Sequence, residues 1–514
     1  MSARPLGIGV ALFALTIVVP ALIVLRTGFD GLYGPDSYAY HDYADGPLRE
    51  SLTRLHPPPP FFWPLGYPLL VVAAARVVAR TSTAGQLVAL VAAGLVPVLT
   101  FVLARALVRT ERLPLSGAAA WAGLFMALTG QLWQSGMVVM SDTPALAAAT
   151  ASAIALVRYR ETRQLRAVLL SGAALAAAVL IRWAYGLLVP PWVVCFLWIS
   201  REAGDWRRGA RHGAAGVAIF VCLLGPEIAL GYLQPLDTGG PSFAGNTGIY
   251  RWSPLNAWRR RFDTVDGRLS YTLPNGLYYA LAPASLAYFT PLAAPLVAVG
   301  LWSLARRRAA FTLLFLVGWA GIVWAFHAGA DWQNIRFGLA YLPPLGILAG
   351  FGAAALLARP RRRVWATAVV VVAIVAMAGA ATRLCLSFVT RMQARLEVVR
   401  WVEAQVPAGS AVLTFGFTQL FQHHARLAVR ELFEETPAGL DALTRAPQPI
   451  YLLVDVRSLS TQWAERSPGV NFRWLRDGPG IVEIGARADA TLFRVRRRVP
   501  DHMRSPDAAT GQRN

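Results

Sequence analysis

Apolar runs of roughly 15–25 residues recur along most of this chain, and they constrain its fold more than any other feature. A run of that length can cross the hydrocarbon core of a bilayer as an α-helix. Only 15% of the 514 residues are charged, against about 25% in a typical soluble protein. The first run (7–25) is followed by no small-residue cleavage site, so we interpret it as a retained helix rather than a signal peptide. The sequence therefore predicts an all-α polytopic membrane protein.

The positive charge of the chain indicates contact with lipid. The formal net charge is +21, and every basic residue is Arg, because Lys is absent. A P-loop, which needs its Lys, is therefore excluded. Most arginines fall in short clusters between apolar runs, which is the positive-inside pattern and would also meet anionic lipid. We expect membrane lipids as partners and no nucleic acid. Neither CxxC nor HExxH occurs, so no zinc site is indicated.

The arginine clusters predict the sidedness of the chain. One pair of apolar runs separates each cluster from the next, so all of them can face the cytoplasm together. The clusters lie at 105–112, 158–166, 201–211, 306–308 and 359–363. The N-terminus is then cytoplasmic, and the outward connections are 26–63 (the first outer loop), 131–142, 182–186, 233–279 (the long outer loop) and 327–336. Residues 64–80 must lie in the outer interface without crossing. We count about eleven transmembrane helices in residues 1–385.

The segment 386–498 has a different character. Apolar residues between 391 and 407 follow helical spacing. The stretches AVLTF (411–415), PIYLLVDV (449–456) and ATLFRVR (490–496) have the composition of strands. These patterns predict a small extracytoplasmic α/β domain. The polar tail 499–514 is expected to be disordered.

Two carboxylates stand out on the predicted outer face. Asp36 lies in GLYGPDSYAYHDYADG, directly after the first apolar run, among aromatic residues in a Gly-Pro turn. Asp142 lies in VVMSDTPALAAAT, in the second outward connection. A carboxylate there could act as a general base. For Asp142 a helix N-cap is an equal alternative, and for Asp42 and Asp45 solvated loop charges are the favoured interpretation.

Two arginines lie close to apolar spans on the same face. Arg182 (in IRWAYG) and Arg336 (in NIRFGLAYLPP) could bind phosphate, because the guanidinium group presents a fixed fork of donors. The alternative is that each only extends to the membrane interface. Glu227 falls within a predicted span, where a carboxylate needs a partner.

Taken in order, these segments resemble the GT-C type membrane glycosyltransferases. The similar branch contains protein mannosyltransferase-like enzymes, the aminoarabinose transferase of lipid A and the rhizobial galacturonosyltransferases. The resemblance covers roughly residues 5–385 and is carried by GPDSYAYHDYA, WPLGYPL (63–69), SDTP (141–144) and the late Arg336 before Leu-Pro. The chain departs from the pattern at Leu65, at Thr143 and in having a single Asp at 36 rather than an acidic pair.

The resemblance implies a GT-C fold and an inverting transferase on the outer face of the bacterial cytoplasmic (inner) membrane. It would move a sugar from a polyprenyl-phosphate donor to a lipid, glycan or protein acceptor. The implied residues are Asp36 and Asp142 for catalysis, Arg336 and Arg182 for the donor phosphate, and Tyr38, Tyr67 and His327 for the substrate pocket. No cofactor is predicted as certain; a divalent metal ion held by Asp36 and Asp142 stays open.

Other functions remain open from the residues alone. The cluster Arg259–Arg261 in the long outer loop keeps an outer-face polysaccharide polymerase or ligase as an alternative. A lipid or solute transporter is disfavoured, because no internal repeat is found and the acidic residues gather on one face. A non-catalytic membrane assembly protein is the remaining alternative.

Overall fold

The computed structural model describes residues 3–78, 80–234 and 251–497. The chain divides into two compact units. The first comprises 1–260 and 272–389, and the second comprises 261–271 and the chain from 390 onward. The predicted disordered tail 499–514 lies outside the described residues, as does the stretch 235–250 of the long outer loop.

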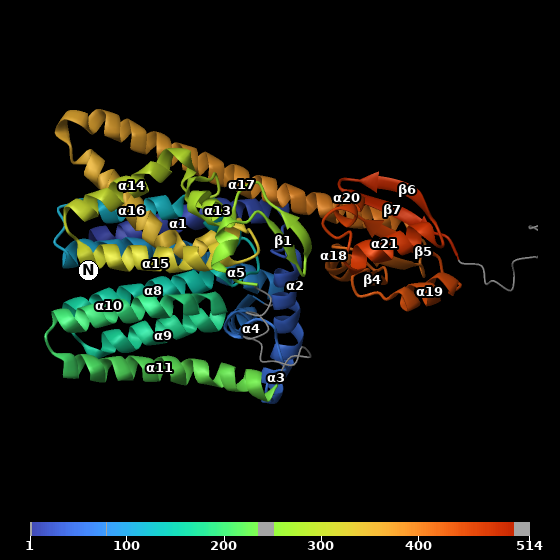
Figure 1. The fold of residues 1–514 in the computed structure, drawn as a ribbon, viewed down its shortest axis with the longest axis horizontal. Helices are drawn as coiled ribbons and strands as arrows, with labels where there is room; N and C mark the ends of the chain where they lie inside the picture. Colours follow the sequence, from blue (N-terminus) through green and yellow to red (C-terminus); the bar gives the residue numbers. More distant parts are fainter. Residues whose placement is uncertain (1–2, 79, 235–250, 498–514) are drawn as a thin grey trace, which may run out of the picture. The chain divides into compact units, whose positions relative to one another are not determined.

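Long helices run side by side in the first unit (Figure 1). They are α1 (Ala3–Thr27), α5 (Thr81–Thr110), α8 (Asp142–Thr162), α9 (Leu165–Ile181), α10 (Val189–Glu202), α11 (Trp206–Leu233), α14 (Thr290–Arg306), α15 (Ala310–Gly329), α16 (Leu342–Leu357) and α17 (Arg363–Gln405), whose end continues into the second unit. The shorter α6 (Ala118–Ala127) packs against α5 and α16. Short helices connect them, namely α2 (Gly34–Tyr43), η1 (Ala44–Leu48), α3 (Arg49–Arg54), α4 (Gly66–Val78), α7 (Gly130–Gly136), η2 (Trp183–Leu188), η3 (Pro254–Trp258), α13 (Asn275–Leu281), η4 (Ala282–Ala284), η5 (Ile335–Tyr341) and η6 (Pro360–Arg362).

The apolar helices confirm a polytopic membrane protein. Within the described residues, 7 helices are long and apolar enough to cross a membrane. The count of about eleven crossings stays a prediction. The helix α4 has 13 residues and rises only about 20 Å, short of a hydrocarbon core of about 30 Å. That length agrees with the predicted interfacial position, which stays a prediction.

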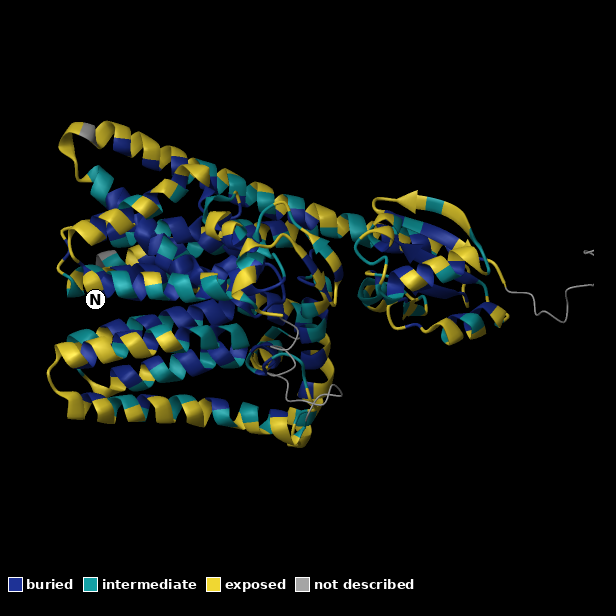
Figure 2. Ribbon diagram, in the orientation of Figure 1, coloured by how far each residue is buried: buried dark blue, intermediate teal, exposed yellow. Residues whose placement is uncertain are grey.

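Burial divides the helices of the first unit into inner and outer ones (Figure 2). Most of α16 is buried, whereas α11 presents exposed apolar residues such as Val217 and Val221. Glycine allows the closest helix contact. A Cβ atom at Gly300 of α14 would collide with the carbonyl oxygen of Leu348, and one at Gly352 of α16 would collide with that of Leu296. Such small-residue contacts are typical of helices that pack within a membrane.

The second unit is built on a mixed sheet with the strand order β4-β3-β5-β7-β6. Its strands are β3 (Ala411–Thr414), β4 (Val429–Glu431), β5 (Ile450–Val454), β6 (Ile481–Arg487) and β7 (Ala490–Val495). The first three are parallel, and β7 is antiparallel to both of its neighbours. The predicted strands are confirmed as β3, β5 and β7. The missed strands β4 and β6 are the edges, and their half-exposed residues lack the apolar run of a buried strand.

Helices cover both faces of this sheet. The end of α17 and α18 (Thr418–His424) pack on one face through residues such as Val402 and Phe421. The other face packs against α19 (Pro437–Arg445), α20 (Val456–Ser460) and α21 (Ser467–Asp477), with Leu440, Leu459 and Phe472 buried. The result is a small α/β domain with a core on each side of the sheet, as the sequence predicts for this region.

A hairpin from the long outer loop belongs to the second unit. The strands β1 (Arg261–Thr264) and β2 (Gly267–Ser270) pair with each other. Arg268 forms an ion pair with Glu465 at 2.5 Å, and Arg466 with Asp263 at 2.6 Å. The sequence predicts that the whole loop 233–279 belongs to the transmembrane domain of residues 1–385, whereas residues 261–271 of the loop pack with the C-terminal unit.

Candidate functional site

Four charged side chains lie at the ends of helices of the first unit. Asp36 is in the first turn of α2, so the predicted Gly-Pro turn is the start of a helix with Pro at its first positions. Asp142 is the first residue of α8. Arg182 follows α9 in extended backbone, and Arg336 lies in η5, just before α16. Chain reversals between helices therefore supply all four groups.

The four side chains form one charged network. Arg336 donates from Nη2 to Oδ2 of Asp36 at 2.9 Å, and its Nε lies 3.6 Å from Oδ2 of Asp142. Arg182 Nη1 lies 3.3 Å from the other carboxylate oxygen of Asp142. Asp36 and Asp142 are thus bridged by Arg336, although Asp36 and Arg336 are separated by 300 positions in the sequence. Sequence reasoning predicted the four residues but not their pairing.

Two buried atoms of this network do not form a hydrogen bond within the described residues. The side chain of Asp142 is only 6% exposed, and that of Arg336 17%. The Oδ2 atom of Asp142 and the Nε atom of Arg336 are nonetheless buried without a hydrogen-bond partner among the described residues. The two atoms face each other at 3.6 Å, as an ion pair too long for a hydrogen bond. Buried groups without hydrogen bonds cost free energy, so a ligand that supplies these bonds would be favoured. Asp36, at 27% exposed, is the more accessible carboxylate.

A cavity of about 270 Å³ adjoins the network. Asp142, Arg182 and Arg336 line it, together with His327. The remaining wall is mostly aromatic and apolar, and its aromatic members are Trp63, Trp183, Tyr185, Phe326 and Phe337. This composition, an apolar wall with a few convergent polar groups, is that of a ligand site.

The predicted pocket residues fall in different places. His327 lines the cavity, with its ring stacked on Phe337 at a centroid distance of 5.0 Å. Tyr38 and Tyr67 are not among the residues that line it. Both are almost fully buried, and the hydroxyl of Tyr67 donates to the carbonyl oxygen of Gly85 at 3.0 Å. Tyr67 therefore stabilises the packing of α4 on α5.

Tyr40 and Ser141 support the network and were missed from the sequence. Their hydroxyls are 3.1 Å apart, and Arg182 Nη1 donates to Ser141 Oγ at 3.3 Å. Burial raises the pKa of Tyr40 well above its ordinary value, so its hydroxyl stays neutral. The available signal was spacing, because Tyr40 lies four residues after Asp36 and shares its face once the segment is a helix.

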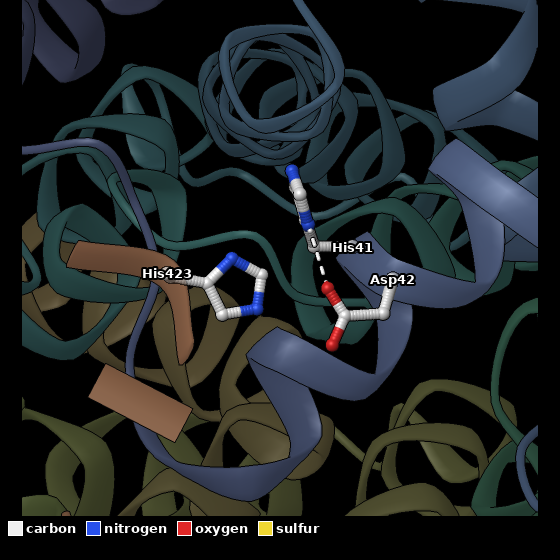
Figure 3. Close-up of side chains that lie close together, drawn as sticks. All are labelled: His41, Asp42 and His423. Atoms are coloured by element: carbon white, nitrogen blue, oxygen red, sulfur yellow. Dashed lines mark hydrogen bonds and ion pairs between the residues drawn. The ribbon is translucent and has the colours of Figure 1, made fainter. Parts of the chain in front are cut away.

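The other acidic candidates lie outside the network. Asp42 is 51% exposed and pairs with the ring Nδ1 of His41 at 3.0 Å (Figure 3). Asp45 is 50% exposed, lies 3.8 Å from Arg49 and accepts a hydrogen bond from Thr81. Glu227 accepts the backbone N–H of Leu65 at 3.3 Å, and this N–H is the partner that the described residues supply. The N-cap of α8 is Ser141, and the Asp142 carboxylate instead faces the arginines.

The carboxylates do not fit a divalent ion held between them. Arg336 lies between Asp36 and Asp142 and pairs with both carboxylates, and Arg182 adds a second positive charge beside Asp142. An ion at this position would have to displace Arg336 from both carboxylates, against the repulsion of a second arginine.

Comparisons with known proteins concern the fold. No family model matches the chain, and no curated protein matches its sequence. The structure is similar to that of ArnT from Cupriavidus metallidurans bound to undecaprenyl phosphate, with a TM-score of 0.58 at 14% identity, covering 94% of this chain and 97% of that one. It is also similar to the oligosaccharyltransferase AglB from Archaeoglobus fulgidus in complex with an inhibitory peptide and a dolichol-phosphate, with a TM-score of 0.60 at 11% identity, covering 95% of this chain and 74% of that one. The chain therefore has the GT-C fold.

Proposed function

We propose that this chain is a glycosyltransferase of the outer face of the bacterial cytoplasmic membrane. It would transfer a sugar from a polyprenyl-phosphate donor to a lipid, glycan or protein acceptor. The proposal rests on one observation: ion pairs connect Asp36, Arg336, Asp142 and Arg182 beside one cavity, in a membrane unit of GT-C fold. The lipid phosphates bound to ArnT and to AglB support a donor of this chemical class.

The choice of donor follows from the predicted sidedness. Nucleotide sugars are not expected outside the cytoplasm, so an outward site needs a sugar carried on a lipid. The leaving group is then a lipid phosphate, which gains negative charge as the bond to the sugar breaks. Arg182 and Arg336 line the cavity, and guanidinium groups offer paired donors to phosphate oxygens. Stabilisation of a developing charge by fixed donors is among the largest contributions to catalysis.

Asp36 is proposed as the general base. The acceptor hydroxyl or amine attacks the anomeric carbon, Asp36 takes its proton, and the carbon–oxygen bond to the phosphate breaks with the electron pair leaving on the polyprenyl phosphate. The configuration at the sugar inverts. Asp36 suits this role better than Asp142, because its side chain is 27% exposed against 6%. Asp142, held between both arginines, is proposed to position them.

This assignment implies that the donor binds before Asp36 can act. Arg336 donates to Oδ2 of Asp36 at 2.9 Å, so that carboxylate oxygen is occupied for as long as the ion pair is formed. A donor phosphate would compete for the same guanidinium group and draw it away from Asp36. The base would thus become available when the donor is in place, and acceptor attack would follow donor binding.

The second unit supports the predicted sidedness. The hairpin β1–β2 follows α11, and the rest of the second unit follows α17. The hairpin packs within that unit, which is expected if the chain after α11 and the chain after α17 emerge on the same side of the membrane. The arginine clusters before α11 and α17 predict that side to be the outer one. The Arg259–Arg261 cluster, which kept a polymerase or ligase open, does not contribute to the cavity wall within the described residues.

The proposal is tested by deleting the gene and extracting the polyprenyl lipids. We expect a polyprenyl-phosphate sugar to accumulate, and a plasmid copy of the unchanged gene to return it to the parental amount. A copy with Asp36→Asn should fail to do so, whereas a copy with Asp42→Asn should succeed. Lipid-linked sugars that are unchanged by the deletion would argue against a lipid-phosphate donor.

A further inference from the structure

A second cavity, of about 570 Å³, opens between α1, α5 and α8. It lies toward the end of α8, whereas Asp142 and the proposed transfer site lie at the start of that helix. Its wall is mostly apolar and includes Leu6, Val10 and Phe13 of α1, Leu95 and Val98 of α5, and Ile154 of α8. Leu6 and Val10 are each 61% exposed, so this cavity faces the lipid side of the bundle.

Charged residues gather at one part of this cavity. Arg105 and Arg109 come from α5, and Arg158 and Glu161 come from α8. Arg109 binds Glu161 through two hydrogen bonds, at 2.9 and 2.5 Å, and Thr110 donates to the same carboxylate at 2.8 Å. Glu161 is therefore already occupied by partners.

The two other arginines are available to a ligand. Arg105 and Arg158 are exposed, and within the described residues neither forms an ion pair or a side-chain hydrogen bond. Three arginines against one glutamate leave an excess of two positive charges at the cavity. A guanidinium group binds phosphate oxygens through paired donors. The adjoining apolar wall fits a hydrocarbon chain, because both its composition and its exposure match those of a lipid-facing surface.

We propose that this cavity binds an anionic phospholipid, with an acyl chain on the apolar wall and the phosphate diester between Arg105 and Arg158. The charge complementarity and the apolar wall together select this occupant over a zwitterionic lipid, whose head group brings its own cation. Basic pockets between transmembrane helices are suited to such head groups. Arginines that merely extend to the interface attract anionic lipid wherever they lie, so a bound lipid is recognised by the dependence of its affinity on Arg105 and Arg158 in particular.

The test uses the full-length protein, purified in detergent. Binding of phosphatidylglycerol and of phosphatidylcholine with identical acyl chains is measured by native mass spectrometry, and thermal melting checks folding. We expect phosphatidylglycerol to bind at least tenfold more tightly. The double variant R105Q/R158Q should bind phosphatidylglycerol roughly 25-fold more weakly than the unchanged protein, because each arginine near an anionic lipid surface contributes about fivefold. Its affinity for phosphatidylcholine should stay unchanged.

The matched control removes the same charge elsewhere. Arg207 and Arg211 of α11 are exposed members of another cluster and do not line this cavity. The variant R207Q/R211Q should keep the full preference for phosphatidylglycerol. An equal loss in both double variants would show a general surface-charge effect and overturn the proposal, as would equal binding of the two lipids by the unchanged protein. Neither result bears on sugar transfer, because no residue of the transfer site is altered.

Discussion

Helix α8 carries a network of arginines and carboxylates at each end, and the two networks differ in how completely they are paired. At the end of the helix, Arg160 donates to Glu202 at 2.8 and 2.7 Å and to Glu111 at 2.9 Å. Its guanidinium group also lies over the ring of Phe311, with its central carbon 4.2 Å from the ring centroid. At the start of the helix, Asp142 and Arg336 each keep a buried atom without a hydrogen-bond partner among the described residues.

The difference separates a structural role from a binding role. The Arg160 network satisfies the nitrogens of its guanidinium group and ties α8 to α10 and to the segment after α5. The Asp142 network leaves its open atoms beside an aromatic cavity. A network that only holds helices together gains by complete pairing, whereas a binding site must keep groups that a ligand can complete.

The all-or-none prediction concerns the side of the membrane on which each network lies. Reporter fusions after residues 110 and 205 should show cytoplasmic activity, and a fusion after residue 400 should show activity outside. The reason is the positive-inside rule, because the five arginine clusters can all be cytoplasmic only in this orientation. Cytoplasmic activity from the fusion after residue 400 would invert the assignment of the two ends of α8.

The next largest effect is expected at Asp36. Asp36→Asn keeps the size of the side chain and removes the base, so the transfer rate of the purified protein should fall by roughly 10²–10⁴. Asp42→Asn is the matched control, because Asp42 is half exposed, pairs with His41 and lies outside the network of Asp36, Asp142, Arg182 and Arg336. Near-normal turnover of the Asp36 variant, with unchanged thermal melting, would remove Asp36 as the base.

Arg336 should tolerate Lys poorly. Lysine supplies a point charge where arginine supplies a fork, and a hydrogen bond to a charged group is worth about 1.5–3 kcal/mol. Donor use by Arg336→Lys should therefore fall roughly tenfold to hundredfold, and Arg336→Ala should be almost inactive. The affinity for the acceptor should change little. Equal activity of the Lys variant and the parent would favour an anchoring role and move the phosphate site to Arg182 or to Arg259–Arg261.

The smallest change in activity is expected from a substitution of Arg160, in the network with Glu111 and Glu202 at the end of α8. Arg160→Gln leaves two carboxylates without their arginine, and breaking a buried pair costs up to about 3–5 kcal/mol of stability. The melting temperature should drop, while the rate per folded molecule stays within about twofold, because distant and independent sites act separately. A selective loss of donor affinity in this variant, with normal melting, would remove the distinction between the networks.

The fold class could be predicted from the sequence because its signals are local. Apolar runs and arginine clusters act over the length of one helix, and so the membrane unit and the strands β3, β5 and β7 were found. The hairpin β1–β2 was assigned to the wrong unit because only its packing against Glu465 and Arg466 decides where it belongs. No local pattern records a contact between residues that lie so far apart in the chain.

The site shows the same limit at the level of single residues. The four charged residues were found by type and sidedness, but the bridge from Arg336 to Asp36 and Asp142 depends on the meeting of α2, η5 and α8. The resemblance implies Tyr38 for the pocket and does not name Tyr40, and the Gly-Pro turn predicted around Asp36 is the start of the helix α2. In a helix, the residue four positions after Asp36 shares its face and the residue two positions after it does not.

The central claim is that the network of Asp142 and Arg336 at the start of α8 binds a lipid phosphate, and that the network of Arg160 at the end of α8 does not. It is tested most directly by measuring the affinity of the purified protein for undecaprenyl phosphate, in the parent, in Arg336→Ala and in Arg160→Gln. We predict at least a tenfold loss of affinity in Arg336→Ala and an affinity equal to the parent's in Arg160→Gln at a temperature where both variants are folded. Unchanged binding by Arg336→Ala, or an equal loss in both variants, would contradict the claim.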